Sequence, residues 1–474
     1  MTTPLSRHAA AASDVQLRAE LCAAVGDDGV FTEPNDLAAY EKGWRYGEGR
    51  ARLVVKPRST EAVAAAVRVC REHGAPIQPM GANTGLVAAS NPDASGEMVV
   101  LSLERLCRSI DFHPEDGTVE VDGGVLLSQL NEFLRPHGRF FPIDLGADPQ
   151  IGGMIVTNTG GSRLVRYGDV RSNLLGIEVV LPGGEVLRQL NRLEKNNTGL
   201  DAKQIFVGTS GAFGIVTRAT LRTRPLPAQT VGALVCATSG DAVVRLLQRI
   251  EPVVADFLSA FEAVSRGAME AVLAHGSYER SPFSSDPPAY AVLVELQSGL
   301  GVEMLDLDDV LGIALAEAME AAPEDIDDVV MGDVEEFWHL RHQVSESLRE
   351  EGTVLGLDVS TPRGEMARFT EAVRARIREI APTTRVCDFG HWGDGGSHLN
   401  IVLDRDTPAD ELGRCKGEIQ DLVYGICVND FGGSYSAEHG VGPHNIRAYE
   451  RYTDPLVRAW CRALAPERFG TVPL

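Results

Sequence analysis

Three glycine-rich segments lie within about one domain's length of this chain, and they constrain its fold more than any other feature. They read P-M-G-A-N-T-G-L-V-A-A-S at 79–90, P-I-D-L-G-A-D-P-Q-I-G-G-M-I-V-T-N-T-G-G at 142–161 and F-V-G-T-S-G-A-F-G-I-V-T at 206–217. Glycines after a strand let backbone N–H groups approach a ligand closely. One such segment alone is as readily a plain turn. Three together predict a backbone wrapped around an extended ligand.

Two common nucleotide motifs are missing from the sequence. None of the three segments fits G-x-G-x-x-G, and no G-x-x-x-x-G-K-[S/T] occurs in the chain. A nucleotide ligand is therefore expected to bind without a Rossmann turn or a P-loop.

The hydrophobic patterning predicts an α+β protein. Strands are expected at 53–55, 75–78, 98–103 and 118–122, helices at 61–72 and 127–134, and a hairpin at 175–181 and 185–190. Pro225 and Pro227 mark an exit from this region. Beyond them we expect helices at 241–250, 304–321, 337–350 and 412–424, with a strand at 290–296.

Composition excludes several classes of partner. The 474 residues carry a formal net charge of −23, which argues against nucleic acid or an anionic membrane, because both need a basic surface. An anionic small substrate then needs a local pocket of positive charge. No apolar run approaches the ~20 residues of a membrane span. The eight cysteines include no C-x-x-C pair, which fits buried thiols in a reducing, cytoplasmic setting.

The window C-D-F-G-H-W-G-D-G-G-S-H-L-N-I-V-L at 387–403 holds a concentration of polar, chemically reactive side chains. Its pattern predicts a strand, a tight loop and a second strand. Because strand side chains alternate, His398 and Asn400 should face the same way, and the loop glycines should fold His391 back toward them. A histidine in a glycine loop is often only a hydrogen-bonding partner, and H-x6-H is no zinc signature by itself. We interpret the window as half of a site.

The expected helix at 337–350 places Trp338, Arg341 and Ser345 on one face by their three- and four-residue spacing. An arginine beside apolar residues can hold a carboxylate through its planar fork. A surface ion pair is the ordinary alternative for such an arginine.

These segments, with K-N-N-T-G-L-D-A-K-Q-I-F-V-G at 195–208, G-H-W-G-D-G at 390–395 and S-A-E-H-G-V-G at 436–442, resemble the FAD-linked oxidases of the vanillyl-alcohol oxidase superfamily. Within it they resemble the D-2-hydroxyglutarate and D-lactate dehydrogenases. The resemblance runs from about residue 53 to the C-terminus. It implies a two-subdomain FAD-binding domain with a ferredoxin-like α+β cap domain. The expected limits are an N-terminal helical segment at 1–52, the FAD-binding domain at 53–227, the cap at 228–431 and a returning catalytic segment at 432–474.

The resemblance also implies roles for individual residues in oxidising a D-2-hydroxy acid to the 2-oxo acid. His391, His398 and Glu438 match the ligands of a divalent metal, most suitably zinc, and His439 matches the general base. Arg341, Ser345 and Asn400 match substrate-binding positions. The expected FAD contacts are Pro79, Gly81, Ala82, Asn83, Thr84, Gly85, Leu86, Ser90, Pro142, Gly146, Gly152, Gly153, Thr157, Asn158, Gly161, Gly211 and Ile215.

The chain departs from the family pattern at several positions. Hydroxyglutarate dehydrogenases carry a lysine two residues before D-x-S-x-P, where this chain has Gly356. A glycine there leaves room for a bulkier or less charged substrate tail, so the identity of the hydroxy acid stays open. The family's G-D-G-N-x-H reads G-D-G-G-S-H at 393–398, so its asparagine is missing. The family's lysine after H-G-x-G falls at Asn445, and its C-terminal N-P-G-K is replaced by T-V-P-L at 471–474.

Two other functions remain as alternatives: an oxidase of another alcohol in the same superfamily, and a flavin-binding subunit without its own chemistry. With no Fe–S cysteines and no nicotinamide fingerprint, we expect electrons to pass to a separate acceptor, either an electron-transfer flavoprotein or a quinone-linked carrier. A homodimer is left open.

Overall fold

The computed structural model describes residues 4–277 and 281–474, so residues 1–3 of the predicted N-terminal segment lie outside the described part. The chain forms two compact units. The first comprises residues up to Thr159, Asp169–Pro225 and Glu438–Leu474, and the second comprises Gly160–Gly168 and Leu226–Ala437. We call them the FAD unit and the cap unit, after the two domains that the family resemblance implies. The domain limits expected from the sequence stay predictions.

The FAD unit contains two principal sheets. A four-stranded sheet has the order β1-β2-β4-β3, in which β2, β4 and β3 are parallel. A five-stranded antiparallel sheet has the order β5-β6-β10-β8-β9, and β7 pairs with β11. The strands are β1 Val30–Phe31, β2 Ala51–Val55, β3 Ile77–Met80, β4 Met98–Ser102, β5 Ile110–His113, β6 Thr118–Asp122, β7 Arg139–Phe140, β8 Leu174–Val180, β9 Val186–Gln189, β10 Ile215–Arg222 and β11 Arg224–Pro225.

Helices cover these sheets, and their sequences explain where they begin. In α3 (Thr60–Glu72), Ser59 caps the first turn by accepting from the Ala62 N–H. Apolar residues of α1 and α3 pack together in one buried core with strands β2 and β4. The helices of this unit are α1 Pro4–Val25, α2 Pro34–Glu41, α3, α4 Leu127–Leu134, α5 Ile151–Thr157, α7 Val170–Asn173, α14 Ile446–Tyr452 and α15 Pro455–Leu464.

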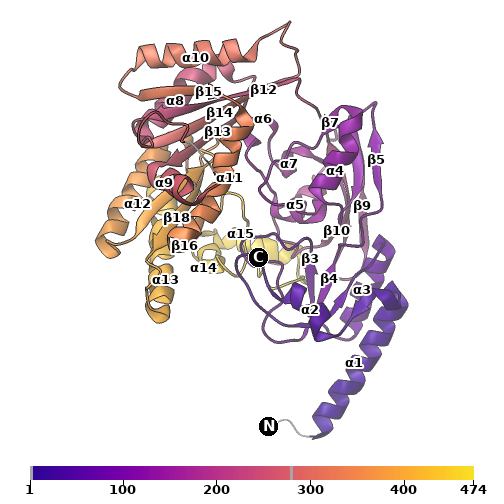
Figure 1. Ribbon diagram of the computed structural model, residues 1–474. Helices are drawn as coiled ribbons and strands as arrows, with labels where there is room; N and C mark the ends of the chain where they lie inside the picture. The colour runs from indigo at the N-terminus through magenta and orange to yellow at the C-terminus, as the bar shows by residue number, and fades with distance from the viewer. Residues whose placement is uncertain (1–3, 278–280) are drawn as a thin grey trace. The chain divides into compact units, whose positions relative to one another are not determined.

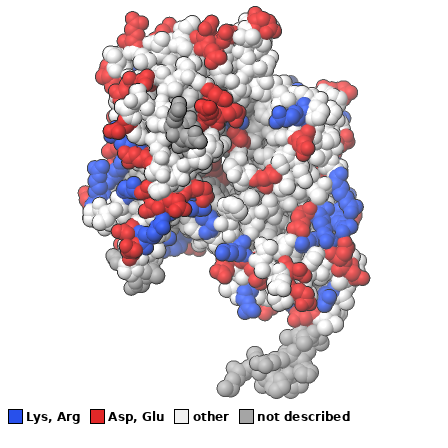
Figure 2. All heavy atoms as spheres, viewed as in Figure 1, with Lys and Arg blue, Asp and Glu red and all other residues white. Residues whose placement is uncertain are grey.

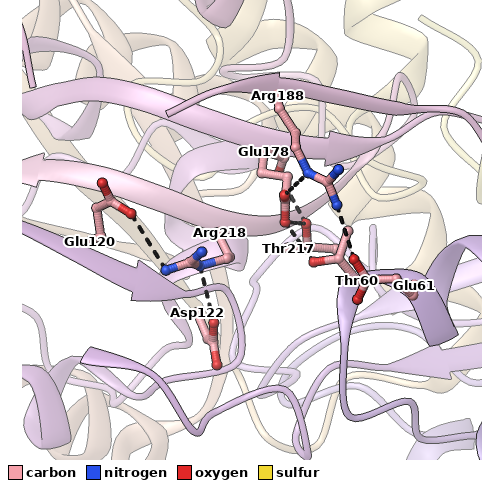
Figure 3. A network of polar contacts seen from close by, with 8 residues as sticks. All are labelled: Thr60, Glu61, Glu120, Asp122, Glu178, Arg188, Thr217 and Arg218. Carbon is pink, nitrogen blue, oxygen red and sulfur yellow. Dashed lines mark hydrogen bonds and ion pairs between the residues drawn. The ribbon is translucent and has the colours of Figure 1, made fainter. Parts of the chain in front are cut away.

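A buried carboxylate joins helix α3 to the five-stranded sheet of the FAD unit (Figure 3). Glu178 on β8 accepts hydrogen bonds from Thr60 Oγ1 at 2.5 Å, from Thr217 Oγ1 at 2.9 Å and from Arg188 Nε at 2.7 Å. Burial alone would raise the pKa of Glu178, but these three hydrogen bonds outweigh it and lower the pKa. The ionised carboxylate therefore fastens the start of α3 to the five-stranded sheet.

The cap unit is built on one antiparallel sheet of seven strands in the order β15-β12-β14-β13-β17-β18-β16. Its first part, β12-α8-β13-β14-α10-β15, has the βαββαβ order of a ferredoxin-like fold, with α9 inserted after β13. This agrees with the predicted cap. Figure 1 shows α9 beside α11, and the two helices share a buried core with one face of the sheet.

The elements of the cap unit are α6 Leu164–Tyr167, β12 Gln229–Ala237, α8 Gly240–Val254, β13 Leu258–Ser265, α9 Arg266–His275, β14 Tyr290–Ser298, α10 Leu307–Ala321, β15 Ile326–Gly332, α11 Val334–Glu351, β16 Thr353–Ser360, α12 Met366–Ile380, β17 Arg385–Gly390, β18 Gly396–Leu403 and α13 Ala409–Gly425. None of the described helices is long and apolar enough to cross a membrane.

Candidate active site

Strands β17 and β18 form the predicted hairpin and bring two histidines together. His391 opens the turn between them, and its carbonyl oxygen accepts from the N–H groups of Asp394 and Gly396 at 3.1 and 3.0 Å. The turn needs the left-handed backbone of Gly395 (φ 90°), which favours glycine. The His391 and His398 rings lie 5.1 Å apart between centroids, with ring nitrogens within 4.8 Å. The loop therefore folds His391 back toward His398.

The cross-strand register places other predicted residues beside His398. On β16, Asp358 lies opposite His398, with 3.9 Å between the carboxylate oxygen and Nδ1, and Gly356 lies opposite Asn400. Cross-strand partners share a face of the sheet, so these four residues line the face covered by α9 and α11. Leu399, between the two polar residues, is fully buried on the other face. The expected alternation of β18 is present.

Arg341 on α11 is held in this region by a residue that sequence reasoning missed. Its Nε donates to Glu262 Oε2 at 2.6 Å, and its guanidinium stacks 4.4 Å from the centre of the Phe389 ring. The other carboxylate oxygen of Glu262 contacts His391 Nδ1. One buried carboxylate thus holds both the predicted substrate-binding arginine and a predicted metal ligand.

Glu262 is completely buried on β13, and its charge is compensated by its partners. Burial alone would raise the pKa of Glu262, but the charges of His391 and Arg341 outweigh it and hold the pKa at about 2. Because Glu262 engages Nδ1 of His391, Nε2 is the ring nitrogen left for the predicted metal. An imidazole supported in this way, beside a second imidazole, fits zinc, which prefers nitrogen and carboxylate ligands.

Ser345 and Trp338 flank Arg341 on α11 as predicted, one turn to either side. Ser345 is half-buried, whereas Trp338 is buried and donates its Nε1–H to Glu295 Oε2 at 2.7 Å. Glu295 also accepts hydrogen bonds from Nε and Nη2 of Arg163, at 2.8 and 2.9 Å. A second buried carboxylate therefore lies under the same helix. Among the described residues, Glu295 forms no hydrogen bond with strand β17 or β18, which carry the histidine hairpin.

The glycine-rich segments of the FAD unit carry its strained backbone. Within the described residues, the non-glycine residues with positive φ are Asn83, Ala88, Asn158 and Ser210, and each lies in one of the three segments. Such conformations cost roughly 1–3 kcal/mol each and concentrate at ligand clamps. The strain supports a binding role for these segments rather than plain turns.

The same segments leave space that a ligand can fill. A Cβ atom added at Gly85, Gly146 or Gly153 would meet nothing within 4 Å. Beside Gly81, the buried Oε1 of Gln150 has no hydrogen-bond partner among the described residues. Gly152 differs, because an added Cβ would lie 3.0 Å from two backbone carbonyls, so packing alone requires a glycine there. A cradle of open glycines with an orphaned acceptor fits an extended cofactor such as FAD.

The remaining predicted FAD contacts fall in several elements. Pro79 lies on β3, Thr157 ends α5 and Ile215 begins β10, whereas Gly161 belongs to the cap unit, in the stretch that carries Arg163. The others occupy the loops of the three segments: Ala82, Thr84, Leu86, Ser90, Pro142 and Gly211.

The segment after Glu438 is fastened to the glycine segments within the FAD unit. Ser210 Oγ donates to Val441 O at 2.6 Å, and His444 N donates to Val87 O at 3.2 Å. Asn445, where the family pattern has lysine, is buried and bonds Gly440 O and the Gly442 N–H at 2.9 Å each. Asn445 therefore shapes the loop that carries Glu438 and His439. The joining of these two residues to the histidine hairpin of the cap unit stays a prediction.

Comparison with known proteins identifies the family. Residues 51–189 match the FAD binding domain model, and residues 226–465 match the model of the FAD linked oxidases, C-terminal domain. The chain belongs to the FAD-linked oxidases. A D-2-hydroxyglutarate dehydrogenase of Xanthomonas citri is 34% identical over 421 residues, covering 87% of this chain and 85% of the relative. A D-2-hydroxyglutarate–pyruvate transhydrogenase of Saccharomyces cerevisiae is 31% identical, covering 87% and 83%.

Solved structures show the same fold for this FAD-linked oxidase. It matches p-cresol methylhydroxylase with a TM-score of 0.70 at 19% identity, covering 96% of this chain and 95% of that one. It matches 4-ethylphenol oxidase from Gulosibacter chungangensis with a TM-score of 0.71 at 18% identity, with the same coverage. The vanillyl-alcohol oxidase type of fold expected from the sequence is therefore confirmed.

Proposed function

We propose that this FAD-linked oxidase converts a D-2-hydroxy acid into the 2-oxo acid with the help of a divalent ion, preferentially zinc. The observation that carries the proposal is the cluster of Arg341, Glu262 and His391. It combines a carboxylate-binding guanidinium with an imidazole oriented for an ion, and one buried glutamate holds both. The names of both relatives contain D-2-hydroxyglutarate, which supports the same substrate class.

We propose that Glu438 completes the ion site of His391 and His398. Chain connectivity supports this assignment. Ser434 exchanges backbone hydrogen bonds of 3.0 and 2.8 Å with Ser360, at the end of the strand that carries Asp358. Glu438 follows four residues later, and each residue spans at most about 3.6 Å. The chain thus keeps this carboxylate within reach of the hairpin.

The residues of the chain then have distinct tasks in the proposed reaction. Arg341, with two guanidinium nitrogens beyond the Nε used by Glu262, binds the distal end of the acid, and Asn400 and Ser345 position it. His439 takes the hydroxyl proton as general base while the C2–H bond breaks. When bound, the flavin supplies a two-electron acceptor for the C2 hydride, and the ion supplies a Lewis acid for the hydroxyl and carboxylate. The product is the 2-oxo acid.

Gly356 supports a substrate range that differs from that of hydroxyglutarate dehydrogenases. It lies opposite Asn400 in the β16–β18 register, where it presents no side chain to the shared face. We therefore propose that the distal substrate end is held by Arg341 alone among the basic residues of this face. Less charged or bulkier 2-hydroxy acids should be accepted beside hydroxyglutarate.

The test is a panel of D- and L-2-hydroxy acids assayed by dye reduction with FAD-loaded protein, after chelation and after zinc is added back. The proposal expects turnover of D acids that falls with chelation and returns with zinc. Turnover of uncharged alcohols in preference to acids would instead support the oxidase alternative. No turnover with any donor or dye would support a flavin-binding subunit. Electron-transfer flavoprotein and quinone analogues, added in place of the dye, test the proposed acceptors.

A further inference from the structure

A cavity of about 540 Å³ lies in the cap unit where two helices begin. Strands β12 and β13 both run antiparallel to β14, so their carboxyl ends reach the same edge of the sheet. Helices α8 and α9 start there, at Ser239 and Ser265, and both serines line the cavity. A volume of this size is typical of sites for small metabolites.

The walls of the cavity are basic, in a chain whose net charge is −23. Four arginines line it against two carboxylates, namely Arg266, Arg368, Arg374 and Arg378 against Asp241 and Glu371. Figure 2 shows basic side chains at the edge of the view where α12 lies, whereas acidic ones dominate over α10. The cavity is therefore a local exception to the acidity of the protein.

The four arginines differ in whether they already form ion pairs with neighbouring carboxylates. Arg374 is held by Asp388 at 2.5 Å, by Glu371 at 2.7 Å and by the Tyr290 hydroxyl at 2.9 Å. Arg368 pairs with Glu365 at 2.6 Å. In contrast, Arg378 forms no ion pair with any described residue. Arg266 likewise has no ion pair among the described residues. The cavity thus combines two guanidinium groups held by ion pairs with two that remain available to an anion.

The two serines at the helix starts behave differently. Ser239 caps α8 in the usual way, because its Oγ accepts from the Ala242 N–H at 3.1 Å. Ser265 makes no such bond to the first turn of α9. Its side chain is only 2% exposed, and its Oγ has no hydrogen-bond partner among the described residues. A buried hydroxyl without a partner is costly, and a turn of the Ser265 side chain toward the cavity would let a ligand group complete it.

We propose that this cavity binds a small phosphate-bearing metabolite through its phosphate group. The Ser265 hydroxyl and the N–H groups at the starts of α8 and α9 provide short-range donors, apart from the Ala242 and Arg266 N–H groups, which already bond Ser239 Oγ and Ala289 O. Arg266 and Arg378 provide charge. Three phosphate oxygens offer these donors more acceptor sites than the two oxygens of a carboxylate.

This site is separate from the candidate active site. Glu262 and Ser265 lie three residues apart on β13, so their side chains point to opposite faces of the sheet. Glu262 shares the face covered by α9 and α11 with Arg341, whereas the cavity includes residues of α8 and α12. The proposal therefore does not depend on the identity of the oxidised substrate.

The test is titration calorimetry of the full FAD-loaded protein in phosphate-free buffer, with inorganic phosphate, 3-phosphoglycerate and citrate as probes. We expect saturable one-to-one binding of the two phosphate probes, with citrate at least about tenfold weaker. Equal binding of citrate would contradict the assignment to phosphate, and absence of saturable binding would overturn the site.

Three variants sharpen the experiment. Ser265→Ala and Arg378→Glu should each weaken 3-phosphoglycerate binding by about tenfold or more. Without phosphate, the midpoint of thermal unfolding of Ser265→Ala should be unchanged or higher than that of the wild type, because the substitution removes an unsatisfied hydroxyl. Arg376→Glu is the matched control: it lies on the same helix, pairs with Glu379 and does not line the cavity. Equal affinities in all three variants would refute the proposal, whatever the result of the dye assay.

Discussion

Replacing Glu262 with glutamine tests the cluster beneath α11 with a minimal change of shape. The side chain keeps its length and one carbonyl acceptor but loses its charge. Arg341 Nε lies 2.6 Å from one carboxylate oxygen, and His391 Nδ1 contacts the other. Glu262→Gln therefore leaves a buried guanidinium without its counter-ion and weakens the orientation of the imidazole.

The expected magnitudes follow from complete burial of the carboxylate. Removing one member of a buried ion pair costs about 3–5 kcal/mol, and the retained acceptor puts this variant near 3 kcal/mol. At an m value of about 3 kcal/mol per molar urea, the unfolding midpoint of the cap should fall by about 1 M. Loss of the carboxylate behind a metal-binding histidine typically weakens metal binding by about 10–100-fold.

The assay compares Glu262→Gln with Glu295→Gln by urea unfolding and by zinc competition against a chromophoric chelator. Glu295 is a matched control, because it is equally buried under α11 and pairs with Arg163 and Trp338. Both variants should lose stability, but only Glu262→Gln should lose zinc affinity. Equal zinc affinities in the two variants would refute the role assigned to Glu262.

Three further outcomes are expected. Gly356→Lys should raise kcat/KM for D-2-hydroxyglutarate by about tenfold relative to that for D-lactate, because it adds a cation opposite Asn400. If steady-state assays give an unchanged ratio of the two kcat/KM values, residue 356 does not face the distal end of the substrate. His439→Asn should lower kcat by about 10²–10⁴-fold while the protein still binds FAD, as judged by its visible spectrum. Glu178→Gln should destabilise the FAD unit by about 2 kcal/mol at neutral pH. Because the pKa of Glu178 is lowered from 4.5 on folding, its contribution is present above that value and is lost as pH falls, so wild type and variant should converge in acid unfolding curves.

Local signals in the sequence predicted many of the elements closely. Helix α4 was expected at 127–134 and spans Leu127–Leu134, because its apolar spacing is regular. Strand β3 was expected two residues early, at 75–78 rather than Ile77–Met80. The reason is that the Ala75 N–H bonds Cys70 O and so belongs to the end of α3. Hydrogen bonds of this kind are not visible in a hydrophobic pattern.

The candidate site was only partly predictable for a similar reason. His391 and His398 lie seven residues apart, and their approach follows from the strand–turn–strand pattern. Glu262 lies 79 residues before Arg341 and 129 before His391, so no local spacing links it to either. The one available signal was an acidic residue inside the apolar run L-S-A-F-E-A-V-S at 258–265. A buried charge in a strand requires partners, but the sequence does not say which.

The central claim is metal-assisted oxidation of a D-2-hydroxy acid, and anaerobic stopped-flow reduction of the bound flavin tests it most directly. One turnover is followed as bleaching of the flavin after mixing with D-lactate or D-2-hydroxyglutarate, without any external acceptor. The proposal predicts bleaching with a D acid but not with its L isomer, loss of bleaching after chelation and recovery with zinc. Bleaching of equal rate in the metal-stripped protein would contradict it.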